Sequence, residues 1–175
     1  MPTALINTGP TQSIRGLLDQ YPWNVSLHLN PEVRWLDRQS VLSLGDQILR
    51  STQTQLFGRS DAGHYGVFLL VPEICSHDLW HYHGFAWIQS QRRTTKLLKG
   101  GARWFTRSVH GFVRNGGCPV PACFGGSEGV DLDRINPSAK IDLLSEPAAA
   151  LRYAEKHWIR DGKEELVCVD GRVTR

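Results

Sequence analysis

The chain has 175 residues, of which 41% are hydrophobic and 21% charged, and its net charge is +3. This length and composition suit a single folded domain and exclude a disordered or fibrous protein. No apolar run is long enough to span a membrane, and the first residues lack the basic and then apolar pattern of a secretory signal, so we expect a cytoplasmic protein without a membrane partner.

The first half of the chain alternates between expected helices and strands. Residues 1–20 are expected to form an N-terminal arm with a short helix near residues 14–19. Asp37 can cap a helix that runs to about Gln53. Apolar alternation, apolar runs and turn signals predict strands over residues 23–29, 65–71 and 82–88, the first ending at Asn30-Pro31.

The second half is less regular. The stretch 89–107, broken by Gly100-Gly101, is expected to be a loop with a short helix before it, and a strand is expected at 108–113. Residues 115–136 are glycine-rich and are expected to form a long irregular insertion, which in a compact domain is more often functional than decorative.

A helix start is predicted at Ser145-Glu146-Pro147, where a capping hydroxyl precedes an acid and a proline. This helix should run to about Arg160, and a last strand is predicted at 165–169. Single helices between strands, with antiparallel hairpins in the middle, predict an α+β fold: one domain over residues 1–175 with a central antiparallel sheet flanked by helices.

The cysteines do not form a disulfide framework. They number four and are scattered, and a chain of this length needs no stapling: Cys75, Cys118, Cys123 and Cys168. Cys118 and Cys123 resemble half of a zinc knuckle, but no second pair follows at ligand spacing. We interpret the cysteines as free thiols.

Charge is unevenly distributed along the chain. No Asp or Glu occurs from Leu79 to Ser127, and this segment carries seven cationic residues: Arg92, Arg93, Lys96, Lys99, Arg103, Arg107 and Arg114. Clustered cations release counterions from phosphates together, which favours a nucleic-acid partner over a merely solvated surface. Trp104 and Phe105 lie within this segment, where they can either stack on unpaired bases or pack in the core.

A candidate metal site lies in the strand 82–88 and just before it. His81 and His83 are two residues apart, so in a strand both imidazoles point to one face and Tyr82 to the other. Glu73, at the end of the preceding strand, would fold beside them in a hairpin. Two imidazoles and one carboxylate leave positions on Mg²⁺ or Mn²⁺ open for water and phosphate, as a catalytic site requires. The alternatives are an accidental histidine pair and a solvated Glu73, with His77 and Asp78 as substitute ligands.

A candidate nucleophile lies on the late helix. Tyr153 and Lys156 are neighbours on one helical face, whereas Leu151, Ala154 and Trp158 form the stripe that packs. A phenol attacks poorly at its ordinary pKa near 10, so it needs a polarised phosphate and a nearby cation, a role that suits Lys156. The alternative is an ordinary amphipathic helix with an exposed Tyr-Lys pair.

Three segments together resemble the HUH endonuclease superfamily, specifically its rolling-circle replication initiator (Rep) proteins. His81-Tyr82-His83-Gly84-Phe85 resembles the metal motif of the family, and Tyr153-Ala154-Glu155-Lys156 resembles its Tyr-x-x-Lys nucleophile motif. The segment from Val25 to Pro31 resembles the first Rep motif, a strand that ends in Asn-Pro. The order and spacing of the segments also agree with the family.

The resemblance implies a sheet that carries the histidines on a middle strand and a tyrosine on a facing helix. It implies that Tyr153 is the nucleophile and that His81, His83 and Glu73 hold Mg²⁺ or Mn²⁺. Members nick single-stranded DNA at a hairpin or origin, leaving a 5′-phosphotyrosine and a free 3′-OH, with a host polymerase and helicase as partners. His157 stands where a second tyrosine would be, so the resemblance is to the single-tyrosine type.

Three alternatives remain open at this point. A transposase or a conjugative relaxase of the same superfamily would keep the chemistry, and a non-catalytic nucleic-acid-binding module would need only the cations. In each of these interpretations the nucleic acid is expected to contact the cations through its phosphates and Trp104 through its bases. The residues expected at the DNA surface are Arg92, Arg93, Lys96, Lys99, Arg103, Trp104 and Arg107. No P-loop motif occurs, so the chain is expected to be a minimal initiator or the nuclease domain of a larger protein.

Overall fold

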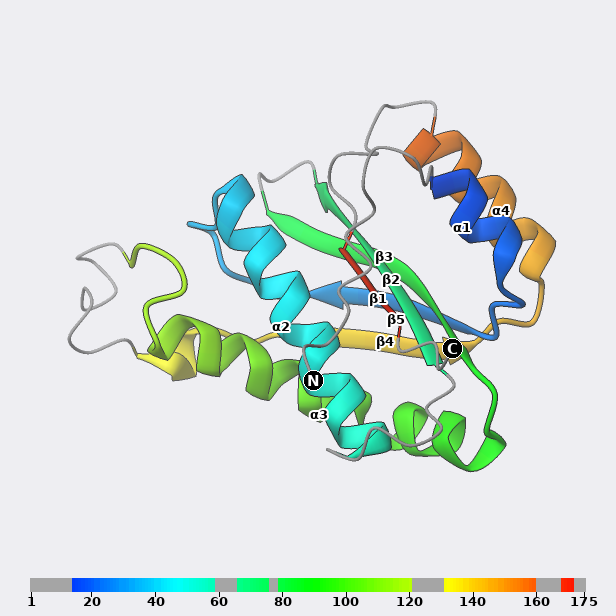
Figure 1. Ribbon diagram of the computed structural model, residues 1–175. Coiled ribbons are helices and arrows are strands. Elements are labelled where there is room, and N and C mark those ends of the chain that lie inside the picture. Colours follow the sequence, from blue (N-terminus) through cyan, green and yellow to red (C-terminus); the bar gives the residue numbers. More distant parts are fainter. Residues whose placement is uncertain (1–13, 59–65, 76–78, 121–130, 160–167, 172–175) are drawn as a thin grey trace.

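Five strands form one antiparallel sheet in the order β4-β1-β3-β2-β5 (Figure 1). The structure, a computed structural model, describes residues 14–58, 66–75, 79–120, 131–159 and 168–171. The strands are β1 (Val25–Asn30), β2 (Gly66–Ile74), β3 (Trp80–Ile88), β4 (Ser138–Leu143) and β5 (Cys168–Gly171). The predicted α+β class, with a central antiparallel sheet and flanking helices, is confirmed.

Helices cover both faces of the sheet, and each pair encloses its own core. On one face lie α2 (Arg38–Phe57) and α3 (Gln91–Arg114), packed on inward side chains of the central strands such as Leu27, Leu70 and Tyr82. On the other face lie α1 (Ile14–Gln20) and α4 (Pro147–Ala154) over a smaller core that includes Leu18, Trp23 and Phe85. The polar end of this second face carries the site described below.

The three central strands form where the sequence predicts them, and β2 continues through Pro72 to Ile74. One glycine in β3 is required by packing, because a Cβ on Gly84 would lie 2.0 Å from the carbonyl oxygen of Leu69. The helix N-cap is also confirmed, since Asp37 Oδ1 accepts a hydrogen bond from the Ser40 amide at 2.7 Å.

The prediction for the basic stretch is wrong. Residues expected to form a loop and then a strand at 108–113 form one continuous helix, α3, capped by the Ser90 side chain, which accepts from the Arg93 amide. The two glycines do not break it because they serve packing: a Cβ on Gly101 would lie 2.5 Å from Ile141 Cδ1 of β4, and one on Gly100 would meet the Trp104 ring.

Strand β4 was not predicted. It lies immediately after the insertion expected at 115–136, and its residues alternate between polar and apolar side chains, with Lys140 and Asp142 exposed and Ile141 partly buried between them. The sequence analysis missed this signal, and backbone pairing with β1 along the whole length of the segment holds it at the edge of the sheet. The ends of the insertion pack inward, since Cys118 and Ile135 are buried, and residues 121–130 are outside the described part.

The late helix begins at Pro147, as expected for a proline in the first turn. Its N-cap is Glu146 and no side chain caps it, so the capping role assigned to Ser145 is wrong. After Ala154 the helix widens into a π-helical turn, Glu155–Ile159. The last strand begins at Cys168, and residues 160–167 fall outside the described residues, as do 1–13 at the start of the N-terminal arm.

Two cysteines are described as free thiols: Cys118, which is buried, and Cys75, which is partly buried. Cys118 Sγ accepts a hydrogen bond from Trp35 Nε1 at 3.1 Å, and burial raises the pKa of this thiol. Cys123, the other half of the zinc alternative, lies outside the described residues. Within the described part of the chain, no helix is both long and apolar enough to cross a bilayer.

Candidate metal and tyrosine site

The sheet register brings the candidate ligands to one patch of the α1/α4 face. Glu73 of β2 pairs with His81 of β3, and His83 of β3 pairs with His28 of β1. Tyr82 points to the other face as predicted, where it is fully buried and its hydroxyl donates to the Val41 carbonyl. The patch therefore follows from strand pairing, which aligns side chains directly opposite one another on the same face.

Glu73 joins the two predicted histidines. Its Oε2 atom lies 3.4 Å from His81 Nε2 and 3.4 Å from His83 Nε2. The glutamate is only 7% exposed, so the alternative of a solvated turn residue does not hold. Two ligands of one ion at about 2.1 Å are separated by roughly 3.0–3.4 Å for octahedral or tetrahedral angles, so these atoms have the spacing of shared ligands.

His28 is the residue that the sequence analysis missed as a ligand. Its ring stacks on His83 with centroids 4.3 Å apart, and His28, His81 and His83 offer nitrogen atoms that all lie within 4.8 Å of one another. These three histidines are close enough to hold a metal ion. The signal was present in the alternation of Val25–Asn30, which turns His28 to the face opposite the buried Leu27 and Leu29.

The surroundings of His28 favour its neutral, ligating form. Burial lowers the pKa of His28, the neighbouring His81 and Lys140 lower it further, and the Glu73 carboxylate opposes them. A neutral imidazole offers a lone pair to a cation without first losing a proton.

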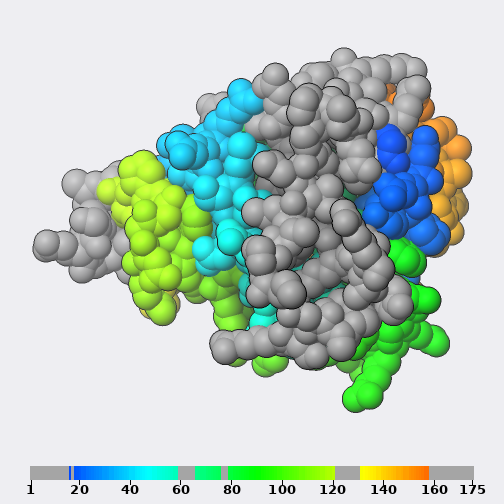
Figure 2. All heavy atoms as spheres, viewed as in Figure 1, coloured from blue at the N-terminus to red at the C-terminus, as the bar shows by residue number. Residues whose placement is uncertain are grey.

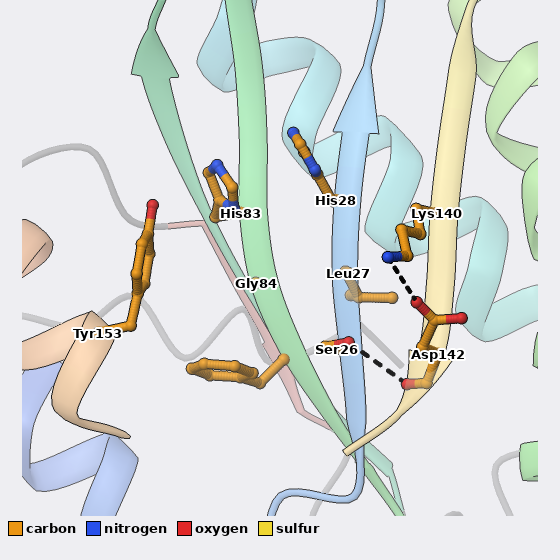
Figure 3. Close-up of a pocket in the computed structure, with 9 residues that line it drawn as sticks. Ser26, Leu27, His28, His83, Gly84, Lys140, Asp142 and Tyr153 are labelled. Carbon is orange, nitrogen blue, oxygen red and sulfur yellow. Dashed lines mark hydrogen bonds and ion pairs between the residues drawn. The ribbon is translucent and has the colours of Figure 1, made fainter. Parts of the chain in front are cut away.

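Tyr153 stands beside this patch, on the helix that covers the face (Figure 3). Its ring centroid lies 5.5 Å from that of His83, and it is 38% exposed. Its hydroxyl hydrogen-bonds to the Glu73 carboxylate, and burial together with the charge of Glu73 and this bond raises the pKa of Tyr153. The His157 ring, in the middle of the π-helical turn, packs on the tyrosine ring with centroids 4.4 Å apart.

A pocket of about 220 Å³ opens between the tyrosine and the sheet. Its walls come from β1, β3, β4 and α4, and they are formed by Ser26, Leu27, His28, His83, Gly84, Phe85, Lys140, Asp142 and Tyr153. Lys140 lies across β4 from His28 in register and forms an ion pair with Asp142 at 3.6 Å (Figure 3). The cation in the pocket wall is therefore Lys140, whereas the predicted Lys156 is exposed on the π-helical turn and does not line the pocket.

The residues expected at the DNA surface lie elsewhere. They belong to α3, which packs on the opposite face of the sheet from the histidines, so they do not extend the pocket. Trp104 and Phe105 are 5% and 2% exposed in the larger core, which corrects the expectation that Trp104 stacks on bases. The substitute ligands His77 and Asp78 fall outside the described residues.

Comparisons of the chain with protein-family models, with curated proteins and with solved structures found no match.

Proposed function

We propose that this protein is a metal-dependent endonuclease that nicks and rejoins single-stranded DNA through Tyr153, as the resemblance to single-tyrosine Rep proteins implies. The observation that carries the proposal is the meeting of the Tyr153 hydroxyl with Glu73, His81 and His83 beside one pocket. These groups come from separate parts of the chain. A chance surface tyrosine would have no reason to face a buried carboxylate between two imidazoles.

The donor set suits a divalent cation. Glu73, His81, His83 and His28 would hold it, and their mixture of one carboxylate and three imidazoles fits Mn²⁺, and also Mg²⁺ through the carboxylate and water. When bound, such an ion polarises a phosphodiester for attack and neutralises charge that develops on it.

Tyr153 supplies the nucleophile. Its Oη atom bonds to the phosphorus of a single-stranded phosphodiester, and the bond from phosphorus to the 3′-oxygen breaks, which leaves a 5′-phosphotyrosine and, after protonation, a 3′-OH. The phenolic proton leaves along the hydrogen bond to the Glu73 carboxylate. Rejoining is the same exchange in reverse, with the 3′-OH as the attacking group. The phosphotyrosine keeps the phosphodiester linkage, so no energy-supplying cofactor is needed.

The remaining wall groups of the pocket orient the strand. Lys140 supplies positive charge for the phosphate on the β4 side. Gly84 and Phe85 line the pocket beside His83, and Phe85 supplies an apolar wall for the adjoining sugar or base.

The test uses single-stranded oligonucleotides with a randomised centre, carrying a label on either the 3′ or the 5′ end, incubated with Mn²⁺ and resolved on a denaturing gel. The proposal predicts that the 3′ label migrates with the protein, because the tyrosine retains the 5′-phosphate, and that the 5′ label appears on a shortened free strand.

Two controls make the test specific. Tyr153→Phe should abolish the adduct, whereas Tyr21→Phe, on the same face of the sheet but outside this pocket, should retain it. An adduct that persists in Tyr153→Phe contradicts the nucleophile assignment. Salt-sensitive DNA binding with no adduct, unaffected by chelator, would support the non-catalytic binding module instead.

A further inference from the structure

The outward face of α3 carries a continuous stripe of cations. We define the α3 basic stripe as Arg92, Lys96, Lys99, Arg103, Arg107 and Arg114, all of them exposed. At about 100° per residue these positions fall within an arc of roughly 80°. The buried side chains of the helix, such as Leu97, Trp104 and Phe105, occupy the opposite side. The stripe is thus one straight, solvent-facing row.

Among the described residues, no carboxylate forms an ion pair with this row. The sequence has no Asp or Glu from Leu79 to Ser127, so α3 contributes none. Within the described residues, the carboxylates that form ion pairs do so with His81, His83, Arg134 and Lys140, and none does so with the stripe. Lys96 donates to the carbonyl of Gln55, which orients its side chain without neutralising it. Six like charges held side by side favour a polyanion.

The stripe is separate from the nuclease pocket. It projects from the sheet face opposite Glu73 and the histidines, since α3 packs with α2 on the larger core. Both ends of α3 are visible at the molecular surface in Figure 2, green near its start and yellow-green near its end. A DNA segment bound here would not be the strand that enters the pocket.

The shape of the stripe distinguishes double-stranded from single-stranded DNA. Arg92 and Arg114 are separated by about 33 Å along the helix axis, at 1.5 Å per residue, which is close to one turn of duplex DNA. Surfaces for single strands combine cations with exposed aromatic rings on which bases stack. The tryptophan and phenylalanine rings of α3, Trp104, Phe105 and Phe112, are all buried, so the stripe offers contacts to phosphates and not to bases.

A lipid surface fits less well than DNA. An amphipathic helix that binds membranes inserts its apolar face into the bilayer. The apolar face of α3 is already packed against α2 and the sheet, and its exposed residues are the six cations of the stripe with Gln91, Thr95 and Ala102.

From these observations we infer that the α3 basic stripe is a second DNA-binding surface, specific for the phosphate backbone of duplex DNA and independent of the pocket that takes single strands. It would hold the protein on double-stranded DNA next to an unpaired segment that the pocket processes. The duplex contact does not depend on the proposed nicking activity, and the experiment below keeps the two apart.

The experiment measures binding of a labelled 20-base-pair duplex of arbitrary sequence by anisotropy. It uses Tyr153→Phe protein in chelator, so neither cleavage nor metal contributes. The test variant adds Lys99→Gln and Arg103→Gln from the middle of the stripe. The matched control adds Arg34→Gln and Arg152→Gln, which remove the same charge from exposed positions outside α3.

Neutralising Lys99 and Arg103 should weaken duplex binding about tenfold at low salt and reduce the slope of log affinity against log salt concentration by about 2. Both effects should be equal for duplexes of unrelated sequence. The control should keep most of the slope. Protein that carries Lys99→Gln and Arg103→Gln but keeps Tyr153 should still form the covalent adduct with a short single strand, provided that the parent protein forms it.

Three results would overturn the inference. These are an equal loss in the matched control, an absence of duplex binding by the unaltered stripe, and an equal effect of the stripe change on a single strand of the same length. Comparable melting temperatures for both variants would establish that each remains folded. If no adduct forms but duplex binding is intact, the proposed nuclease activity is refuted and the duplex-binding inference is retained.

Discussion

His28 and His83 face each other across β1 and β3, in register, with their rings stacked at a centroid distance of 4.3 Å. The contact adds a third imidazole to the pair that the sequence marks, and it places the ligands on two strands. An ion held there would tie β1 to β3 through side chains as well as through the backbone. Metal binding should therefore stabilise the fold.

The first prediction concerns that third imidazole. His28→Ala should weaken Mn²⁺ binding at least tenfold, because it removes one of the clustered nitrogen donors, and titration calorimetry on the Tyr153→Phe background would measure it. His110→Ala is the control, since His110 Nε2 contacts the Ile135 carbonyl away from the site. Unchanged affinity in His28→Ala would show that His28 is a neighbour of the site and no ligand.

The second prediction concerns metal preference. Imidazole nitrogen suits Mn²⁺ and later transition metals better than Mg²⁺, which prefers oxygen ligands. A site with three histidines and Glu73 should bind Mn²⁺ at least tenfold more tightly than Mg²⁺, as read from the rise in melting temperature with each ion. Equal stabilisation by both ions would mean that the imidazoles do not coordinate and that Glu73 acts with water alone.

The third prediction separates the two lysines. Lys140 lines the pocket and Lys156 does not, so Lys140→Ala should lower the rate of adduct formation about tenfold or more, through lost charge at the phosphate. Lys140→Arg should restore much of the rate, and Lys156→Ala should cost less than Lys140→Ala. The reverse ranking would return the role to Lys156, as the sequence motif implies.

The fourth prediction concerns packing at Gly84. A methyl group there would lie 2.0 Å from the Leu69 carbonyl oxygen, so Gly84→Ala should force β2 and β3 apart and reduce the free energy of unfolding by about 1–3 kcal/mol.

A glycine in another element provides a control in which the same substitution should raise the stability of the fold. Gly111 of α3 has its nearest neighbour at 3.8 Å, so Gly111→Ala should raise stability by up to about 1 kcal/mol through helix propensity. Urea unfolding of both variants measures the difference. Equal stability of Gly84→Ala and the parent protein would mean that the strands can separate there at no cost.

Much of the local structure could be predicted from sequence. The strands around Leu27, Leu69 and Phe85 were located by period-two alternation and apolar runs, and the N-cap of α2 by Asp37, because these are preferences of short segments. The same reasoning failed for α3, where the glycine pair reads locally as a break. The close approach of Ile141, a residue distant in the sequence, shows that Gly101 serves packing within the helix.

Some residues of the candidate site could also be predicted from the sequence, and others could not. His81, His83 and Tyr153 could be identified from their spacing and motif, and Glu73 from its place before a turn. His28 and Lys140 could not, because each becomes part of the site through a strand pairing: His28 with His83, and Lys140 with His28.

The sequence alone determined the alternation of the central strands, the α+β class and the placement of His81 and His83 on one side of β3 with Tyr82 on the other, since all three depend on neighbouring residues and on the geometry of an extended chain. The tertiary structure decided which groups meet. It joined Glu73 and His28 to the histidine pair, brought Tyr153 over them, buried Trp104, and placed the α3 basic stripe on the opposite face. Strand order and the packing of helices on a sheet depend on contacts between distant segments, and no local pattern encodes them.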